Sequence, residues 1–146
     1  MNPTTFADQY QAATRDAITT LLHWAVVGTG SPTTIATPPG SWITAQAHAV
    51  LRTMRDGTAR CCPHLGPSPR RVHAALWAPG RVVCPLCLPT LRPRTALEDN
   101  TCDQCRRLVR AIYSCAAAIG PIVLAFGLCQ RCLPANTTHP TEETAR

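Results

Sequence analysis

Four short cysteine-containing turns follow one another in the second half of the chain. Three have the form Cys-x-x-Cys and the first has the form Cys-Pro-His, and together they comprise Cys62 and His64, Cys84 and Cys87, Cys102 and Cys105, and Cys129 and Cys132. Two thiolates in such a turn can reach one metal ion at about 2.3 Å, while nearby backbone amides donate hydrogen bonds to the sulfur atoms. The eight donors fill two tetrahedral sites, one with three thiolates and an imidazole and one with four thiolates. The pattern predicts two structural Zn²⁺ ions.

The four turns can be shared between two ions in two ways. Sequential pairing joins the first turn to the second and the third to the fourth, whereas a cross-braced arrangement joins the first to the third and the second to the fourth. We favour sequential pairing, because a hairpin between Cys105 and Cys129 closes a site locally at a low cost in loop entropy.

Two alternatives remain open within the first site. Cys61 precedes Cys62 and could bind in its place, and His73 could replace His64. We rank Cys62 with His64 first, because the intervening proline stiffens the turn. Cys115 lies between the last two turns among alanines, and we expect it to be a small buried residue of the core.

The segments around the cysteines have a β-like pattern. Proline-rich turns separate short runs at 81–83, 108–118 and 122–126, and Gly120-Pro121 favours a buried hairpin turning at residues 119–121. The 19 residues from Ala111 to Cys129 carry no charge and approach the length of a membrane-spanning helix. However, cysteine pairs that share one ion would hold the two ends of this stretch close together, so we expect no membrane span.

The first half of the chain has a helical pattern instead. Apolar residues recur at three- and four-residue steps from Thr4 to Val27, and Ser41 is a suitable N-cap for a second helix ending at Arg55. A proline-rich connector at 29–40 separates these helices, which we expect to pack as a helical hairpin.

The predicted fold is therefore small and α+β. An N-terminal helical hairpin at 1–58 precedes a double zinc-site β-ribbon region at 59–133, of zinc-ribbon or treble-clef type, and residues 134–146 form a disordered tail.

Composition suggests a compartment but no particular partner. The first residues lack the basic start of a secretory signal, so we expect a cytoplasmic protein with reduced thiols. The formal charge of +6 comes from 14 basic residues, all of them arginine, against eight acidic ones. Two thiolate-bound zinc ions would lower this charge to about +3. The basic balance is therefore a weak indication of nucleic-acid binding.

Several enzyme classes are excluded by missing motifs. The chain has no His-x-Glu or Cys-x-Glu element of a zinc deaminase, no His-Glu-x-x-His and no glycine-rich phosphate loop. Cys84-Pro85-Leu86-Cys87 has the form of an oxidoreductase dithiol, but three further pairs favour metal binding. Filled four-ligand sites leave no open position for catalysis, so we expect neither an enzyme nor a small-molecule substrate.

Four motifs carry a resemblance to a known group. They are Cys62-Pro63-His64-Leu65, then Ala75-Leu76-Trp77-Ala78-Pro79 before Cys84-Pro85-Leu86-Cys87, then Cys102-Asp103-Gln104-Cys105, and finally Gly127-Leu128-Cys129-Gln130-Arg131-Cys132. In this order they resemble small uncharacterised zinc-ribbon-like proteins of GC-rich bacteria, over residues 61–133. The resemblance implies metal binding and says nothing about activity. Arg106 stands where a ribbon knuckle usually has glycine.

Two functions fit these predictions. Arginines beside the turns could contact phosphates of nucleic acid, or the transcription machinery, through Arg70, Arg71, Arg106, Arg107 and Arg110. Alternatively, the protein is an adaptor or regulator that docks a protein partner on its helices, since the apolar stripes and Trp24 and Trp42 offer more surface than two short helices bury. The sequence leaves the oligomeric state open.

Overall fold

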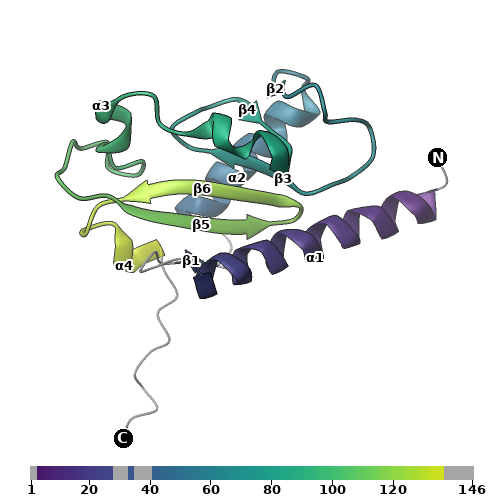
Figure 1. Cartoon of the computed structure of the whole chain (residues 1–146), viewed down its shortest axis with the longest axis horizontal. Coiled ribbons are helices and arrows are strands. Elements are labelled where there is room, and N and C mark those ends of the chain that lie inside the picture. Colours follow the sequence, from purple (N-terminus) through teal and green to yellow (C-terminus); the bar gives the residue numbers. More distant parts are fainter. Residues whose placement is uncertain (1–2, 28–32, 35–40, 137–146) are drawn as a thin grey trace, which may run out of the picture.

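The computed structural model describes residues 3–27, 33–34 and 41–136 (Figure 1). Two long helices and a four-stranded sheet form most of the fold, and short elements carry the cysteines. In chain order the elements are α1 (Pro3–Val27), β1 (Thr33–Thr34), α2 (Trp42–Arg55), β2 (Arg60–Cys61), β3 (Val72–Ala75), β4 (Arg81–Val82), the 3₁₀ helix η1 (Pro85–Leu91), α3 (Ala96–Asp99), β5 (Tyr113–Ile119), β6 (Ile122–Leu128) and α4 (Leu133–Asn136).

The predicted β-hairpin is the centre of the sheet. Strands β5 and β6 pair antiparallel from Tyr113–Leu128 to Ile119–Ile122, so the turn consists of Gly120 and Pro121. Gly120 has φ +55°, a conformation that favours glycine, and the proline that follows has a fixed negative φ. The sheet order is β1-β5-β6-β3, and β1 and β3 pair in parallel with the hairpin strands.

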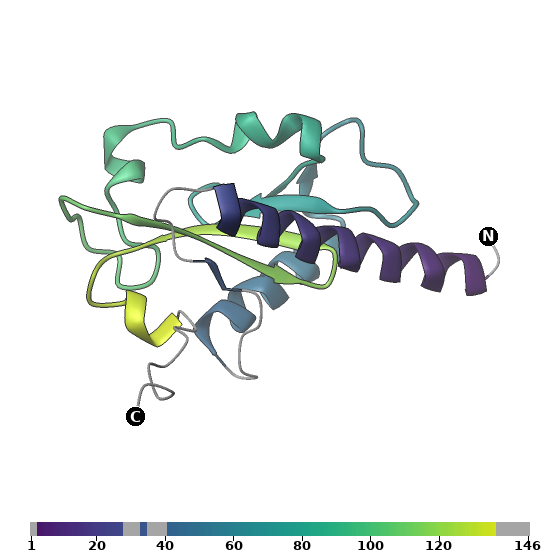
Figure 2. The same cartoon turned by 60° about the horizontal axis from the view of Figure 1, so that its bottom comes forward.

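The two long helices cover opposite faces of this sheet. On one face Trp24 of α1 contacts His73 with ring centroids 5.7 Å apart, and on the other Trp42 of α2 contacts Phe126 at 5.9 Å. Figures 1 and 2 show the sheet between α1 and α2. The predicted helical hairpin is not confirmed, because the sheet separates the helices and buries both faces of its central strands instead.

The core on the α2 side is the larger one. It joins Ile43 and Ala47 of α2 to Leu124 and Phe126 of β6, together with three metal-ligand candidates described below. Residues of the predicted helical half and the predicted cysteine half therefore share one core.

Helix α1 buries only part of its predicted apolar stripe. Ala13, Ala17 and Leu21 are buried against the sheet, whereas Phe6 and Leu22 are each 47% exposed. The N-terminal half of α1 extends beyond the hairpin turn (Figure 1). An apolar strip of α1 therefore remains on the surface.

Two short elements depart from the expected loops. Thr33 and Thr34 of the predicted connector form β1, and residues 133–136 form α4. Asn136 is buried and donates hydrogen bonds from its side chain to Gln104 and to the carbonyl of Cys132, so the predicted disordered tail is wrong for residues 134–136. The rest of the tail, 137–146, and most of the connector lie outside the described residues.

No helix in the described parts of the chain is both long and apolar enough to cross a bilayer. The uncharged stretch that approached such a length is the hairpin of β5 and β6.

Buried His73 makes the fold sensitive to acid. Its side chain packs against Trp24, and its Nε2 atom has no hydrogen-bond partner among the described residues. Burial, followed by the charge of Arg71, lowers the pKa of His73 to about 4, and Asp16 acts weakly in the opposite direction. In the unfolded chain the imidazole regains its usual pKa of about 6.5.

We therefore expect the free energy of unfolding to fall as the pH drops from about 6.5 to about 4, because only the unfolded chain takes up this proton. The loss is about 3 kcal/mol in chemical denaturation across that window. His73→Phe keeps an aromatic ring and removes the titratable group. Protonation of the thiols affects both proteins alike, so it cancels when their free energies of unfolding are subtracted. Parallel stability curves for the two proteins would contradict this role of His73.

Candidate metal centres

The structure brings the predicted ligands together in two clusters. The first centre comprises Cys62, His64, Cys84 and Cys87, and the second comprises Cys102, Cys105, Cys129 and Cys132; within each, the donor atoms all lie within 4.8 Å of one another. Each cluster could hold one metal ion. The clusters follow sequential pairing of the turns rather than the cross-braced arrangement.

Two parallel strands position cysteines of the first centre. Strands β2 and β4 pair side by side; Cys62 follows directly after β2, and Cys84 lies two residues beyond the end of β4. The backbone N–H of Cys62 donates to the carbonyl of Val82, and the N–H of Cys84 donates to Sγ of Cys62 at 3.2 Å. Cys87 lies one turn later in η1, and its N–H donates to the carbonyl of Cys84.

Donor separations in the first centre match a tetrahedral ion. Nδ1 of His64 lies 3.7 Å from Sγ of Cys84 and 3.3 Å from Sγ of Cys87. A tetrahedral zinc ion with ordinary bond lengths would separate a sulfur and a nitrogen ligand by about 3.6 Å. The imidazole therefore already lies close to the position of a fourth ligand.

The second centre joins a turn to the end of the hairpin. The N–H of Cys129, directly after β6, donates to Sγ of Cys102 at 3.4 Å. The sulfur atoms of Cys105 and Cys129 are 3.8 Å apart, which is the separation of about 3.8 Å expected for two thiolates on one tetrahedral zinc ion. Cys132 immediately precedes α4.

Asp103 ties the second centre to the sheet. Its carboxylate accepts a hydrogen bond from the N–H of Gly127 at 2.7 Å, and its own N–H donates to the carbonyl of Gly127. A Cβ atom at Gly127 would lie 2.6 Å from Cγ2 of Ile112, so glycine at this position leaves room for that side chain. Sequence reasoning missed Asp103, because an aspartate between two ligands has no local pattern that distinguishes it from a solvated one.

Arg106 takes the conformation that glycine usually supplies after a knuckle. Its φ is +63°, and it is the one residue other than glycine with a positive φ in the described ranges. Its N–H donates to the carbonyl of Cys102, and its guanidinium lies 3.7 Å from Asp103. Arg106 therefore keeps the turn conformation that glycine usually supplies at this position.

Electrostatics in the first centre favour a bound cation. Burial opposes the charge of Cys62, but hydrogen bonds from the backbone of Cys84 and His64 and from both their side chains outweigh it and lower its pKa to about 6. Burial raises the pKa of Cys87 to about 11, together with the side chains and charges of Cys84 and Cys62. Cys62 therefore ionises readily, whereas ionisation of Cys87 is unfavourable unless a cation lies between the two sulfur atoms.

The second centre has the same asymmetry. Burial again opposes ionisation of Cys129, but backbone hydrogen bonds from Cys132 and Arg131 and side-chain bonds from Cys102 and Cys132 lower its pKa to about 7. Burial raises the pKa of Cys132 to about 12, and hydrogen bonding to Cys129, Cys102 and Cys105 adds to this effect.

The alternative ligands lie elsewhere. Cys61 is exposed and outside the first cluster, and His73 is buried against α1. Cys115 is buried, as expected for a core residue, and burial raises its pKa to about 12.

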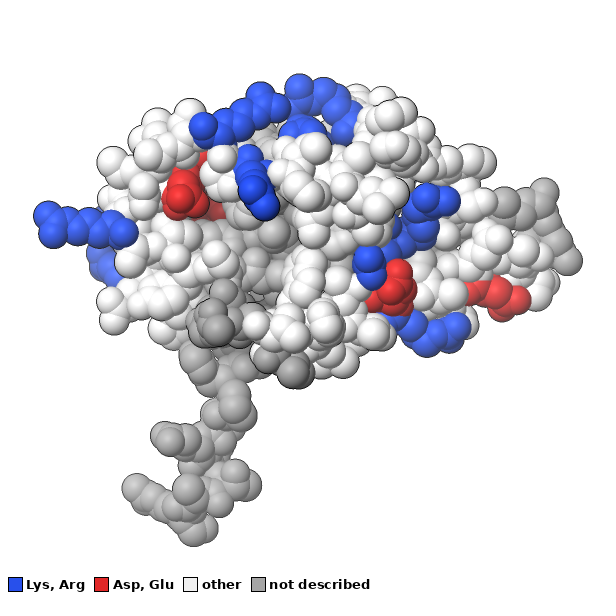
Figure 3. Space-filling model, in the orientation of Figure 1, with Lys and Arg blue, Asp and Glu red and all other residues white. Residues whose placement is uncertain are grey.

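The predicted nucleic-acid residues fall into two groups from different segments. Arg71 is engaged by Asp16 at 2.9 Å and by Thr20, both on α1, and Arg70 donates to the carbonyl of His64. The second group, beside the second centre, is exposed and comprises Arg106, Arg107 and Arg110. On the face seen in Figure 3 the arginines likewise occur in separate groups.

Comparisons of the chain with family models, curated proteins and solved structures found no match. What the protein does must therefore follow from its own residues.

Proposed function

We propose that the protein is a non-catalytic module in which two zinc ions hold the fold and the surface beside them contacts nucleic acid. The observation that carries the zinc assignment is the donor set. Seven thiolates and one imidazole, in two closed groups of four, suit zinc better than the hard cations, which prefer oxygen.

Closed sites favour a structural role over catalysis. A catalytic zinc ion keeps a position for water or substrate, and here four protein ligands take every position. None of the nine cysteines forms a disulfide, which is consistent with a reducing cytoplasm and with resemblance to zinc-ribbon proteins. The hairpin between the two halves of the second centre supports a zinc-ribbon or treble-clef type for that region.

Exposed arginines beside the second centre support the nucleic-acid contact. Arg107 and Arg110 have no side-chain partner within the described chain, and Arg106 pairs only with Asp103. Guanidinium groups bind phosphates in a bidentate manner. A bound metal ion would fix the loop that carries these arginines, so phosphate binding would cost little further entropy.

The double variant Arg107→Gln/Arg110→Gln tests this contact. We expect weaker binding of a single-stranded oligonucleotide in fluorescence anisotropy, because each arginine neutralises one phosphate. The slope of log K against log salt should fall by about 0.7 for each lost contact. The control, Arg15→Gln/Arg52→Gln, removes the same charge from exposed positions on α1 and α2. Equal losses in both variants would indicate a general charge effect and contradict the contact.

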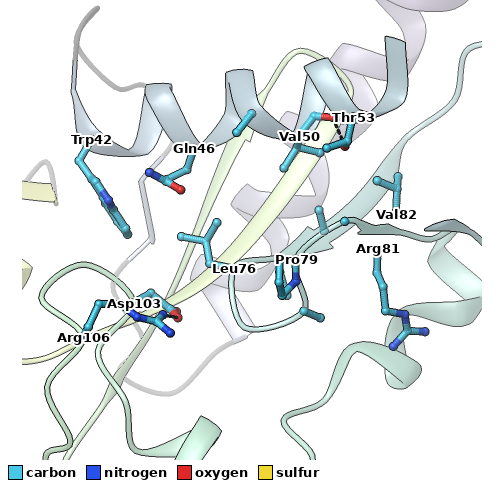
Figure 4. A pocket seen from close by; sticks show the side chains of 15 residues that line it. Trp42, Gln46, Val50, Thr53, Leu76, Pro79, Arg81, Val82, Asp103 and Arg106 are labelled. Atoms are coloured by element: carbon cyan, nitrogen blue, oxygen red, sulfur yellow. Dashed lines mark hydrogen bonds and ion pairs between the residues drawn. The ribbon is translucent and has the colours of Figure 1, made fainter. Parts of the chain in front are cut away.

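An adaptor function is the second candidate, and exposed apolar surface on both helices favours it. A cavity of about 350 Å³ lies beneath α2, where Trp42 and Val50 face Leu76, and Asp103 and Arg106 lie at its other end (Figure 4). The strip of α1 described above adds a second apolar area.

Salt dependence separates the two candidates. An apolar interface loses little affinity as the salt concentration rises, whereas phosphate contacts weaken steeply. A native partner whose binding is insensitive to salt would favour the adaptor.

A further inference from the structure

A small cleft whose lining includes none of the metal-ligand candidates and none of the arginines considered above contains four arginines. It has a volume of about 180 Å³, and its charged and aromatic lining comprises Arg60, Arg81, Arg92, Arg94, Glu98 and Trp77. We propose that this cleft binds the phosphate group of a phosphate monoester, such as the 5′-phosphate of a nucleotide or of a nucleic-acid end.

The strand register places two of these arginines side by side. Arg60 of β2 and Arg81 of β4 are direct partners in a parallel pair, so their side chains leave the same face of the strands. Like charges at such positions repel each other and destabilise a strand pair unless an opposite charge lies between them. The register therefore creates a place for an anion.

Among the described residues, no acidic side chain fills that place. The carboxylate of Glu98 accepts a hydrogen bond from the backbone N–H of Arg94 at 2.7 Å, and it makes no ion pair with the guanidinium groups of the described chain. The side chains of Arg60, Arg92 and Arg94 have no hydrogen-bonding or ionic partner in that part of the chain. Three guanidinium groups are thus available to a ligand.

The cleft is built on fixed elements. Arg81 points away from α2 (Figure 4) and donates to the carbonyl and the hydroxyl of Thr90 at 2.8 and 3.1 Å. The indole N–H of Trp77 donates to the carbonyl of Leu91. These three hydrogen bonds hold the end of η1, and Arg92 and Arg94 follow directly in the chain.

The charge of the cleft favours a monoester over a diester. A monoester phosphate carries about two negative charges near neutral pH and presents three acceptor oxygens, whereas a diester carries one charge. Several forked guanidinium groups facing a single carboxylate suit the dianion. Trp77 in the wall supplies a ring surface against which a nucleobase can stack.

This inference does not rest on the proposed nucleic-acid contact. That contact uses arginines beside the second metal centre, and the cleft uses a different set. Each can fail while the other stands.

Calorimetric titration of the zinc-loaded protein tests the cleft. We expect adenosine 5′-monophosphate to bind, inorganic phosphate to compete with it and adenosine to give no binding. Arg60→Gln and Arg92→Gln, both at exposed positions, should each weaken binding about tenfold, as expected for the loss of a charged hydrogen bond. Arg15→Gln is the matched control and should stay within about twofold.

Oligonucleotides distinguish the source of the phosphate. Binding of a 5′-phosphorylated strand that depends on Arg92, without binding of its 5′-hydroxyl counterpart at the cleft, would assign the site to a nucleic-acid end. Binding of the mononucleotide alone would assign it to a free nucleotide, and both results support the inference. If adenosine 5′-monophosphate does not bind, or if Arg15→Gln weakens it as much as Arg92→Gln, the inference is wrong.

Discussion

Replacement of Cys129 or Cys102 by serine is expected to release one of two zinc ions and to abolish the cooperative melting of the protein. Both side chains are buried in the larger core, and the Cys129 N–H donates to the sulfur of Cys102. A structural zinc ion contributes on the order of 10 kcal/mol to folding, which is comparable to the whole stability of a small domain. Metal analysis by plasma mass spectrometry and thermal melting by circular dichroism would measure the effect.

Cys115→Ala is the matched control for this experiment. Cys115 is another buried cysteine of the same hairpin, but it lies outside both clusters. The control should retain two zinc ions and lose only about 1 kcal/mol of stability. A Cys129→Ser protein with two zinc ions and a native melting curve would rule out the second centre as a structural zinc site.

Cys62→Ser should have a comparably large effect at the first centre. It removes one thiolate from the first centre and the acceptor of the hydrogen bond from Cys84. We expect zinc to fall from two ions to one per chain and the free energy of unfolding to fall by several kcal/mol. Strand β4 and η1 should lose protection in hydrogen exchange, because the ion no longer joins them to β2.

Its control differs from it by one position. Cys61 is exposed and outside the cluster, so Cys61→Ser should keep both ions and change stability by no more than about 0.5 kcal/mol. If the two variants exchange behaviour, Cys61 is the ligand.

Local patterns predicted the two long helices and the hairpin, but not β3, η1 or α3. Helix α1 ends at Val27 as expected, and the Ser41 hydroxyl caps α2 by accepting a hydrogen bond from the N–H of Thr44 at 3.3 Å. The turn at Gly120-Pro121 was also predicted, because each of these features depends on neighbouring residues. The eight residues of the two clusters followed from their spacing for the same reason.

The arrangement of the elements did not follow from local patterns. Strand β3 pairs with β6 across about fifty residues, and no feature of Val72–Ala75 alone identifies that partner. One signal was present for the helices: Ile122–Leu128 is apolar without alternation, which is typical of a strand covered on both faces. The helical periodicity of the apolar residues predicts Phe6 as a core residue. It does not show that α1 extends beyond the sheet at this end.

The arginine cleft could not be predicted from the sequence either. Arg60 and Arg81 are 21 positions apart, and only the register of two two-residue strands makes them neighbours. The net charge of the sequence does not show where arginines gather. The pairing of β2 with β4 brings these two together in one cluster.

The position of the sheet also determines when this protein can fold during its synthesis. Both long helices are translated before the hairpin whose faces they cover, and Cys132, which completes the second centre, leaves the ribosome later still. Until then the apolar faces of α1 and α2 have no sheet to cover them. We therefore expect these faces to stay exposed until the hairpin has been made, and the residues of the second centre to come together only as the hairpin buries both helices.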